Sequence, residues 1–147
     1  FRRVLFRSTT FSLINGAIDS INKVGSNYIA YCFSQVSGFS KFGSYLGNGL
    51  GTNDGPFVYC GFRPRWIMIK CMTALGDWVI VDTARDPNNL VGSTVAANHT
   101  GATAAALNLD ILSTGFKIRS ATLNNTNGAT YIYVAFAENP IKYALAR

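Results

Sequence analysis

Short runs of β-branched and aromatic residues alternate with turns throughout the chain, and this pattern leaves little room for any fold other than an all-β one. Each run is four to nine residues long, and Gly, Asn, Ser, Thr and Pro separate the runs. Helical spacing of apolar positions does not persist beyond a few residues before one of these breakers intervenes. We expect eight strands, at residues 10–14, 28–36, 56–60, 65–72, 77–82, 108–112, 116–119 and 130–137.

Eight short strands joined by turns predict two packed layers of sheet. We therefore expect an all-β fold, an antiparallel β-sandwich with a jelly-roll or concanavalin-like lectin architecture and little or no helix. The composition agrees, because 48% hydrophobic residues are enough to fill one core and only 14% of the residues are charged. The clearest pair of strands is the hairpin of 66–70 with 78–81. The stretches 43–55 and 86–106 are predicted to be long loops.

The beginning and the end of the chain repeat one pattern. The offset between the two copies is 103 to 105 residues, which is the size of a domain. Both faces of each copy are apolar, so we expect each copy to be a central strand covered on both sides. The core-facing residues are predicted to be Ile29, Tyr31 and Phe33 in the first copy and Ile132, Val134 and Phe136 in the second. We treat residues 9–147 as a single domain and leave open that 9–36 close a preceding tandem module. The matching positions are Phe11, Asn22, Gly25 and 28–34 in the first copy, and Phe116, Asn125, Gly128 and 131–137 in the second.

Half of the net positive charge of the chain comes from three arginines at its start. Residues 2–8 resemble the translation of a sequencing adapter in a metagenomic reading frame, and we interpret residues 1–8 as a non-native leader. Without the three arginines of this stretch the net charge falls from +6 to +3, which is an ordinary surface. We therefore expect no nucleic-acid partner. No apolar run approaches the roughly 20 residues that span a bilayer, so we expect a soluble chain without membrane insertion.

The residues that usually carry catalysis or bind metals are scarce. His99 is the only histidine and Glu138 the only glutamate, and no predicted strand carries acids at alternate positions. Two carboxylates held close together are the usual requirement of a retaining glycosidase. The three cysteines lack metal-type spacing. We therefore expect no enzyme activity, no cofactor and no metal. Asp82 and Asp86 flank Arg85, which indicates a salt bridge or turn cap rather than an acid/base pair.

A series of motifs runs in fixed order along the chain. They are YIAYCF at 28–33, GFSKFGSY at 38–45, GPFVYCGFRP at 55–64, WVIVDTARDP at 78–87, LSTGFKIR at 112–119 and YIYVAFAENP at 131–140. From residue 26 to 147 this series resembles a family of uncharacterised phage domains. The resemblance implies a module near the C-terminus of a large phage structural protein, often after lectin-like or SPRY-like sandwich modules. It implies a place in the virion tail after synthesis in the host cytoplasm, and it supplies no catalytic residues.

Three functions follow from these expectations. The leading one is a non-catalytic phage tail or fibre module that contributes to host-surface recognition, with a bacterial surface polysaccharide as its partner. The alternative is an architectural spacer or oligomerisation module that contacts copies of itself or sister fibre modules. A polysaccharide-degrading enzyme is a weaker third. A binder is expected to cluster exposed aromatic and amide groups at one end of the domain, whereas a spacer is expected to expose an apolar flank. The candidate ligand-binding residues lie in the two predicted loops and are Tyr45, Asn48, Asn53, Asp54, Asn98 and His99.

Overall fold

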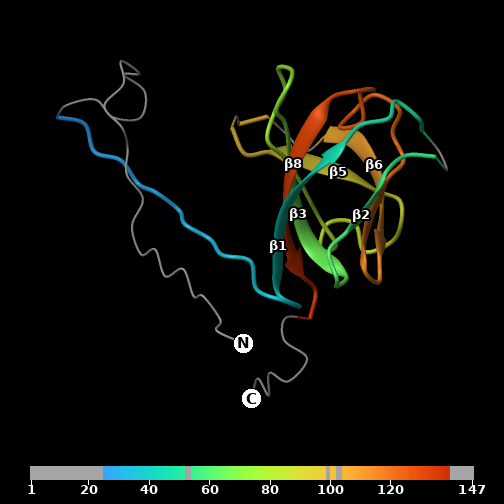
Figure 1. Ribbon diagram of the computed structural model, residues 1–147, viewed down its shortest axis with the longest axis horizontal. Coiled ribbons are helices and arrows are strands. Elements are labelled where there is room, and N and C mark those ends of the chain that lie inside the picture. The colour runs from blue at the N-terminus through green and yellow to red at the C-terminus, as the bar shows by residue number, and fades with distance from the viewer. Residues whose placement is uncertain (1–24, 52–53, 99, 102–103, 140–147) are drawn as a thin grey trace, which may run out of the picture. The chain divides into compact units, whose positions relative to one another are not determined.

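The strands of the computed structural model all lie in the second of two units into which the chain divides, residues 1–33 and 34–147 (Figure 1). The structure describes residues 25–51, 54–98, 100–101 and 104–139. No helix occurs in these ranges, and every strand pair is antiparallel. The predicted all-β antiparallel fold is confirmed. The strands are β1 Ser40–Leu46, β2 Phe57–Tyr59, β3 Pro64–Cys71, β4 Val79–Asp82, β5 Val91–Ala96, β6 Ala104–Leu112, β7 Gly115–Ile118 and β8 Thr130–Ala137.

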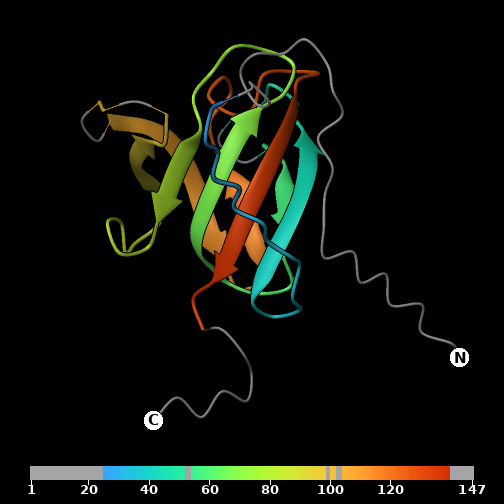
Figure 2. The ribbon, with the colours of Figure 1, turned by 90° about the vertical axis from the view of Figure 1, so that its left-hand side faces the viewer.

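The eight strands form one continuous sheet in the order β1-β8-β3-β4-β5-β6-β7-β2. Strand β8 pairs with β1 on one side and with β3 on the other, and Figure 2 shows these three strands side by side. The sheet curls so that its two halves face each other. The ring of Phe116 on β7 lies 6.3 Å from the ring of Tyr45 on β1 and 5.5 Å from that of Tyr133 on β8. Strand β5 joins the two halves of the sheet, because it pairs with β4 on one side and with β6 on the other.

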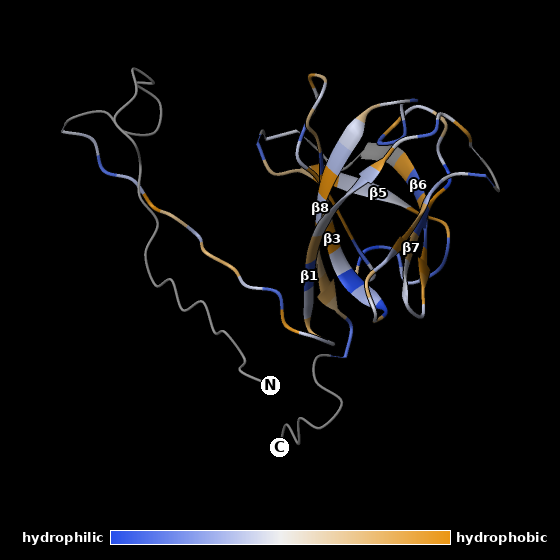
Figure 3. Ribbon diagram, in the orientation of Figure 1, coloured by the Kyte–Doolittle hydropathy of each residue, from blue (hydrophilic) through white to orange (hydrophobic). Residues whose placement is uncertain are grey.

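The core fills the space between the two halves of this sheet. Alternate side chains of the strands point inward, as the twofold period of a strand requires. Figure 3 shows hydrophobic segments on strands such as β6 and β7, and hydrophilic ones on many of the connections. Each large apolar side chain buried in this way contributes about 1.5–3 kcal/mol. The most completely buried ones are Ile67, Ile69, Leu107, Leu109, Ile111, Phe116 and Ile118.

Strand β8 is central, as predicted, but its core-facing side is the opposite of the predicted one. Its buried residues are Tyr131, Tyr133, Ala135 and Ala137, whereas Ile132, Val134 and Phe136 are half-buried on the other face. Both faces of β8 are apolar, so hydrophobicity alone did not distinguish them. The hydroxyl of the inward Tyr131 accepts a hydrogen bond from the backbone N–H of Thr126, at 3.0 Å, so this polar group is satisfied.

Several predicted strand boundaries differ from those of the structure, and β6 begins at Ala104 rather than at 108. Residues 28–35 belong to no strand, although a strand was predicted at 28–36, and the strand predicted at 10–14 lies outside the described residues. Strands β1 and β5 occupy parts of the predicted loops 43–55 and 86–106. Gly43 made β1 look like a turn. It is glycine because a Cβ there would lie 2.9 Å from the ring of Tyr133.

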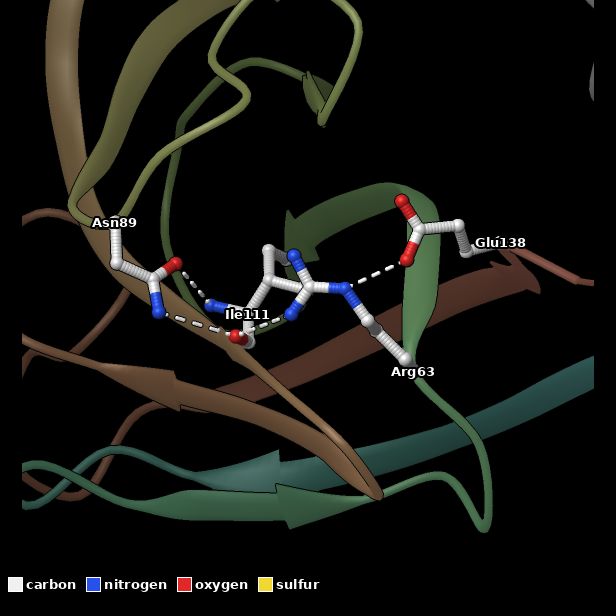
Figure 4. Close-up of polar contacts among 4 residues, drawn as sticks. All are labelled: Arg63, Asn89, Ile111 and Glu138. Atoms are coloured by element: carbon white, nitrogen blue, oxygen red, sulfur yellow. Dashed lines mark hydrogen bonds and ion pairs between the residues drawn. The ribbon is translucent and has the colours of Figure 1, made fainter.

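The polar residues considered as acids and bases stabilise the fold instead. The side chain of Arg63 donates to Glu138 at 2.6 Å and to the backbone oxygen of Ile111 at 3.0 Å (Figure 4). Asn89 makes two hydrogen bonds to the backbone of Ile111, as a neighbouring strand would. The Arg63–Glu138 pair therefore joins the end of β8 to the beginning of β3, and Arg63 extends this link to the end of β6.

Asp82 and Asp86 cap turns, as the sequence predicted. Asp82 accepts the backbone N–H groups of Ala84 and Arg85 and forms an ion pair with the Arg85 side chain at 2.6 Å. Asp86 accepts the backbone N–H groups of Ser93 and Gly92, and these hydrogen bonds lower the pKa of the Asp86 carboxyl. Both carboxylates are thus acceptors that order the connection between β4 and β5.

Ionisation of the buried thiol and phenol should destabilise the domain in alkali. Burial raises the pKa of Cys60 from 9.0 to about 11 and that of Tyr133 from 10.0 to about 12. Because the unfolded chain loses these protons first, the free energy of unfolding falls as the pH rises above 9. We expect calorimetry to show a thermal midpoint that declines between pH 9 and pH 11, and a shallower decline in Cys60→Ala. A midpoint that stays constant up to pH 11 would contradict this expectation.

Candidate functional site

A cleft of about 340 Å³ opens beside the end of β3. Its walls come from the 72–78 loop between β3 and β4, from β5, and from the 119–129 loop between β7 and β8. The lining combines groups that exchange hydrogen bonds with apolar side chains, which is the usual make-up of a small-ligand site. The polar side chains are Asp77, Thr94, Thr122, Asn124 and Thr126, and the larger apolar ones are Leu75, Val79, Val95 and Leu123.

The 119–129 loop is organised by the fully buried side chain of Asn125. Its amide nitrogen donates to the backbone oxygens of Leu50 and Ser120, at 2.7 and 3.0 Å, and to the side chain of Asn48 at 3.0 Å. Its amide oxygen accepts the backbone N–H of Asn48 at 2.9 Å. One buried amide therefore ties the turn after β1 to the loop that forms one wall of the cleft.

Close approach of the backbones completes this attachment. A Cβ at Gly47 would collide with the backbone oxygen of Thr126, so the turn after β1 can lie against the loop only with glycine there. The neighbouring Asn124 adopts a left-handed backbone with φ of 57°, a conformation that asparagine tolerates better than most residues. Its backbone oxygen accepts the hydroxyl of Tyr45 at 2.8 Å. These contacts fix the direction in which Asn124 enters the cleft wall.

The opposite wall, the 72–78 loop, is held at both of its ends. Met72 donates its backbone N–H to the backbone oxygen of Thr130 at 2.8 Å, and Lys70 donates to the backbone oxygen of Gly76 at 2.7 Å. The side chain of Asn98 accepts the backbone N–H of Trp78 and donates to the carboxylate of Asp77, both at 3.0 Å. The carboxylate of Asp77 is thus positioned at the cleft by a hydrogen bond from beyond β5.

Cys71 ends β3 at the floor of the cleft. Burial acts to raise the pKa of its thiol, but hydrogen bonds from Thr73 and Ala74 outweigh burial, and the pKa is lowered. Its sulfur lies 3.9 Å from the hydroxyl oxygen of Thr73. Tyr45 behaves in the opposite way, since burial raises the pKa of its phenol well above the ordinary value. Tyr45 is therefore a neutral packing and hydrogen-bonding group over the whole physiological range.

Of the six predicted ligand-binding residues, the four that the structure describes do not line this cleft, and Tyr45, Asn48 and Asn98 support its walls. Tyr45 stacks on Tyr131 at 5.1 Å and belongs to the edge of the core, and Asn48 is engaged by Asn125. Asn98 orders the 72–78 loop. Asp54 is exposed in a turn, where its backbone oxygen accepts the side chain of Asn48. The remaining two predicted residues, Asn53 and His99, lie outside the described residues.

The residues that line the cleft were not singled out by sequence reasoning. The 119–129 loop did carry a signal, because it is a polar stretch of more than ten residues between two clear strands. Its asparagine and threonine side chains are of the types that ordinary turns also contain. Which of them enter a cleft depends on the hydrogen bonds of Asn125, and these join residues more than 70 positions apart.

Other kinds of site find little support among the described residues. In those ranges no group of three or more His, Cys, Asp or Glu side chains is placed to hold a metal ion. Several basic residues are held by the protein itself, since Arg63 binds Glu138 and Arg119 binds Asp110 at 2.6 Å. A search of the described part of the chain for a helix long and apolar enough to cross a membrane found none.

Comparison with known proteins places the chain in a family. A domain of unknown function, DUF7483, matches residues 3–140, and the chain therefore belongs to this family. The matched range includes both copies of the repeated pattern, 28–34 and 131–137. No curated protein matches the chain. No solved structure matches it either.

Removing the side chain of Asn125 should loosen one wall of the cleft. We expect Asn125→Ala to lower the free energy of unfolding by roughly 1–3 kcal/mol, because buried partners such as the backbone N–H of Asn48 lose their hydrogen bonds. Urea denaturation measures this loss. Asn127→Ala is the matched control, since Asn127 is exposed in the same loop, and it should change stability by less than about 0.5 kcal/mol. Equal effects of the two substitutions would refute the role given to Asn125.

Proposed function

We propose that the chain is a non-catalytic module of a phage tail or fibre protein, and that the cleft between the 72–78 and 119–129 loops binds a bacterial surface glycan. The phage context of this proposal rests on the motif series from residue 28 to residue 140. The binding role rests on the cleft. Its volume of about 340 Å³ falls within the range of small-ligand sites.

The chemistry of the lining suits a sugar. Hydroxyl groups of a glycan both donate and accept hydrogen bonds, and the threonine hydroxyls, the amide of Asn124 and the carboxylate of Asp77 offer matching partners. The apolar side chains of Leu75 and Leu123 give contact area for the C–H faces of the ring. Both leucines are exposed, so burial under a ligand would be favourable.

The same lining favours binding over hydrolysis. Glycoside hydrolysis usually needs two carboxylates at a set separation, and Asp77 is the one carboxylate among the residues that line the cleft. Glu138, Asp82 and Asp86 are engaged in ion pairs or turn caps. A polysaccharide-degrading function therefore has the weakest support of the three.

A second candidate function is architectural, and the edge strand β2 favours it. This strand is three residues long and lies at the end of the sheet order, and its two outward side chains, Phe57 and Tyr59, are exposed. Exposed aromatic side chains at a sheet edge suit a contact with a neighbouring module of a fibre. The two candidate functions use different parts of the surface, so one experiment can weigh them.

Binding of the purified chain to an array of bacterial surface glycans tests the proposal. We expect a saturable ligand whose affinity falls roughly tenfold in Asp77→Asn, because a hydrogen bond to a charged acceptor is replaced by a weaker one. Asp54→Asn, which alters an exposed aspartate that does not line the cleft, is the control and should bind like the unmodified chain. A folded chain that binds no glycan even when displayed multivalently, or equal affinity in both variants, would overturn the role of the cleft. The first of these outcomes would favour the architectural function.

A further inference from the structure

Residues 28–34 have the apolar sequence of a buried strand, but the structure does not place them in a strand. The segment is apolar, and residues 26–35 belong to no strand. The side chains of Ile29 and Tyr31 are 82% and 80% exposed. Burying a side chain of this size contributes about 1.5–3 kcal/mol, so pairing of the segment with a sheet that covers these side chains would be favourable.

The segment aligns with β8 at an offset of 103 residues. Tyr28, Ile29 and Phe33 stand where β8 has Tyr131, Ile132 and Phe136, and the residues at positions 32 and 34 are small like their counterparts in β8. The residue three positions ahead of the first tyrosine agrees in conformation as well as in type. Gly25 and Gly128 both have a left-handed backbone, with φ of 80° and 75°.

The place that β8 occupies explains which positions must match. Ala135 is fully buried and pairs with Lys41 on one side and Ile67 on the other, so a small residue is required there. Cys32 and Ser34 supply small residues at the positions of Ala135 and Ala137.

The aromatic residues of the segment also match the ring contacts that β8 makes with β1 and β3. Tyr131 stacks on Tyr45, and the ring of Phe136 lies 5.6 Å from that of Trp66 on β3. Tyr28 and Phe33 put the same ring types at these two positions. If the segment took the place of β8, its small residues Cys32 and Ser34 would therefore face inward and Ile29 and Phe33 would face outward, as their counterparts in β8 do.

At two positions the segment differs from β8 in the size of the side chain, and these differences constrain the domain that would take up the segment as a strand. Ala30 replaces Tyr133, whose ring packs on Phe116 and fills the space over Gly43. A domain that receives the segment has room for a side chain at the position of Gly43, because the ring that excludes a Cβ there is missing. Tyr31 replaces Val134 on the half-buried outer face, where a larger side chain costs little.

We propose that residues 28–34 form the last strand of a second module with the fold of residues 34–147, inserted between its β1 and β3 strands. The chain then contains the junction of two modules. Residues 35–39 separate the end of one module's last strand from the first strand of the next, and five residues span at most about 18 Å. The turn in which Val36 accepts the backbone N–H groups of Phe39 and Ser40 shortens this connection. Successive modules are therefore joined by a short connection.

An insertion into the full chain tests the proposal. A second copy of residues 34–127 is placed between residues 24 and 25, so that residues 25–34 follow it where 128–137 follow residue 127 in the original domain. We expect backbone amides of residues 28–34 to exchange with deuterium roughly 100-fold more slowly than in the unmodified chain. The thiol of Cys32, which is exposed in the unmodified chain, should become resistant to alkylation.

The control is the same insertion with Ser26 deleted. This deletion shifts the segment by one residue and turns its inward side chains outward, so it should not protect residues 28–34. A second variant carries Ala30→Tyr in the inserted protein, so that a tyrosine ring fills the space that Tyr133 occupies in the original domain. This variant shows whether a cavity at position 30 is what prevents the segment from pairing. The proposal is overturned if residues 28–34 stay unprotected in both inserted proteins, or if the deletion protects them equally well.

Discussion

The pairing of β8 with both β1 and β3 is the interaction on which the rest of this domain depends. It joins the last strand of the domain to the first, with Ser40 opposite Phe136. It also places Tyr131 and Tyr133 against the rings of Tyr45 and Phe116, which connect the two halves of the curled sheet. Contacts between residues so distant in sequence are costly in loop entropy, and a largely apolar strand with two inward tyrosines offsets that cost.

The cleft inherits its geometry from the same strand. The hydroxyl of Tyr131 accepts a hydrogen bond from Thr126, and the stacked Tyr45 donates to Asn124, so both residues fix the 119–129 loop. Asn125 then attaches this loop to the turn after β1. The cleft is thus held in place by strands and a buried amide, and the ordering of its walls is the feature that makes it the candidate site.

The sequence predicts the features that depend on neighbouring residues, and it misses those that depend on contacts between residues far apart in the chain. Strand β8 was predicted with its bounds correct, and the hairpin of β3 with β4 was recognised, because β-branched and aromatic runs between turns are local signals. Strand β1 was missed because Gly43 makes room for Tyr133, a residue 90 positions away. The segment 28–36 was predicted as a strand for the same reason that β8 was, yet it has no partner strands in the described part of this chain. The cleft was missed because Asn125 and Asn98 act through contacts that no local pattern contains.

Native-state hydrogen exchange in increasing urea tests most directly whether β8 closes the domain. If β8 closes the domain, the amides of β8, β1 and β3 open together in the global unfolding step, with the same free energy and the same dependence on urea. Amides of β8 that exchange through a separate, smaller opening while β3 remains protected would contradict it, because the domain would then be stable without its last strand.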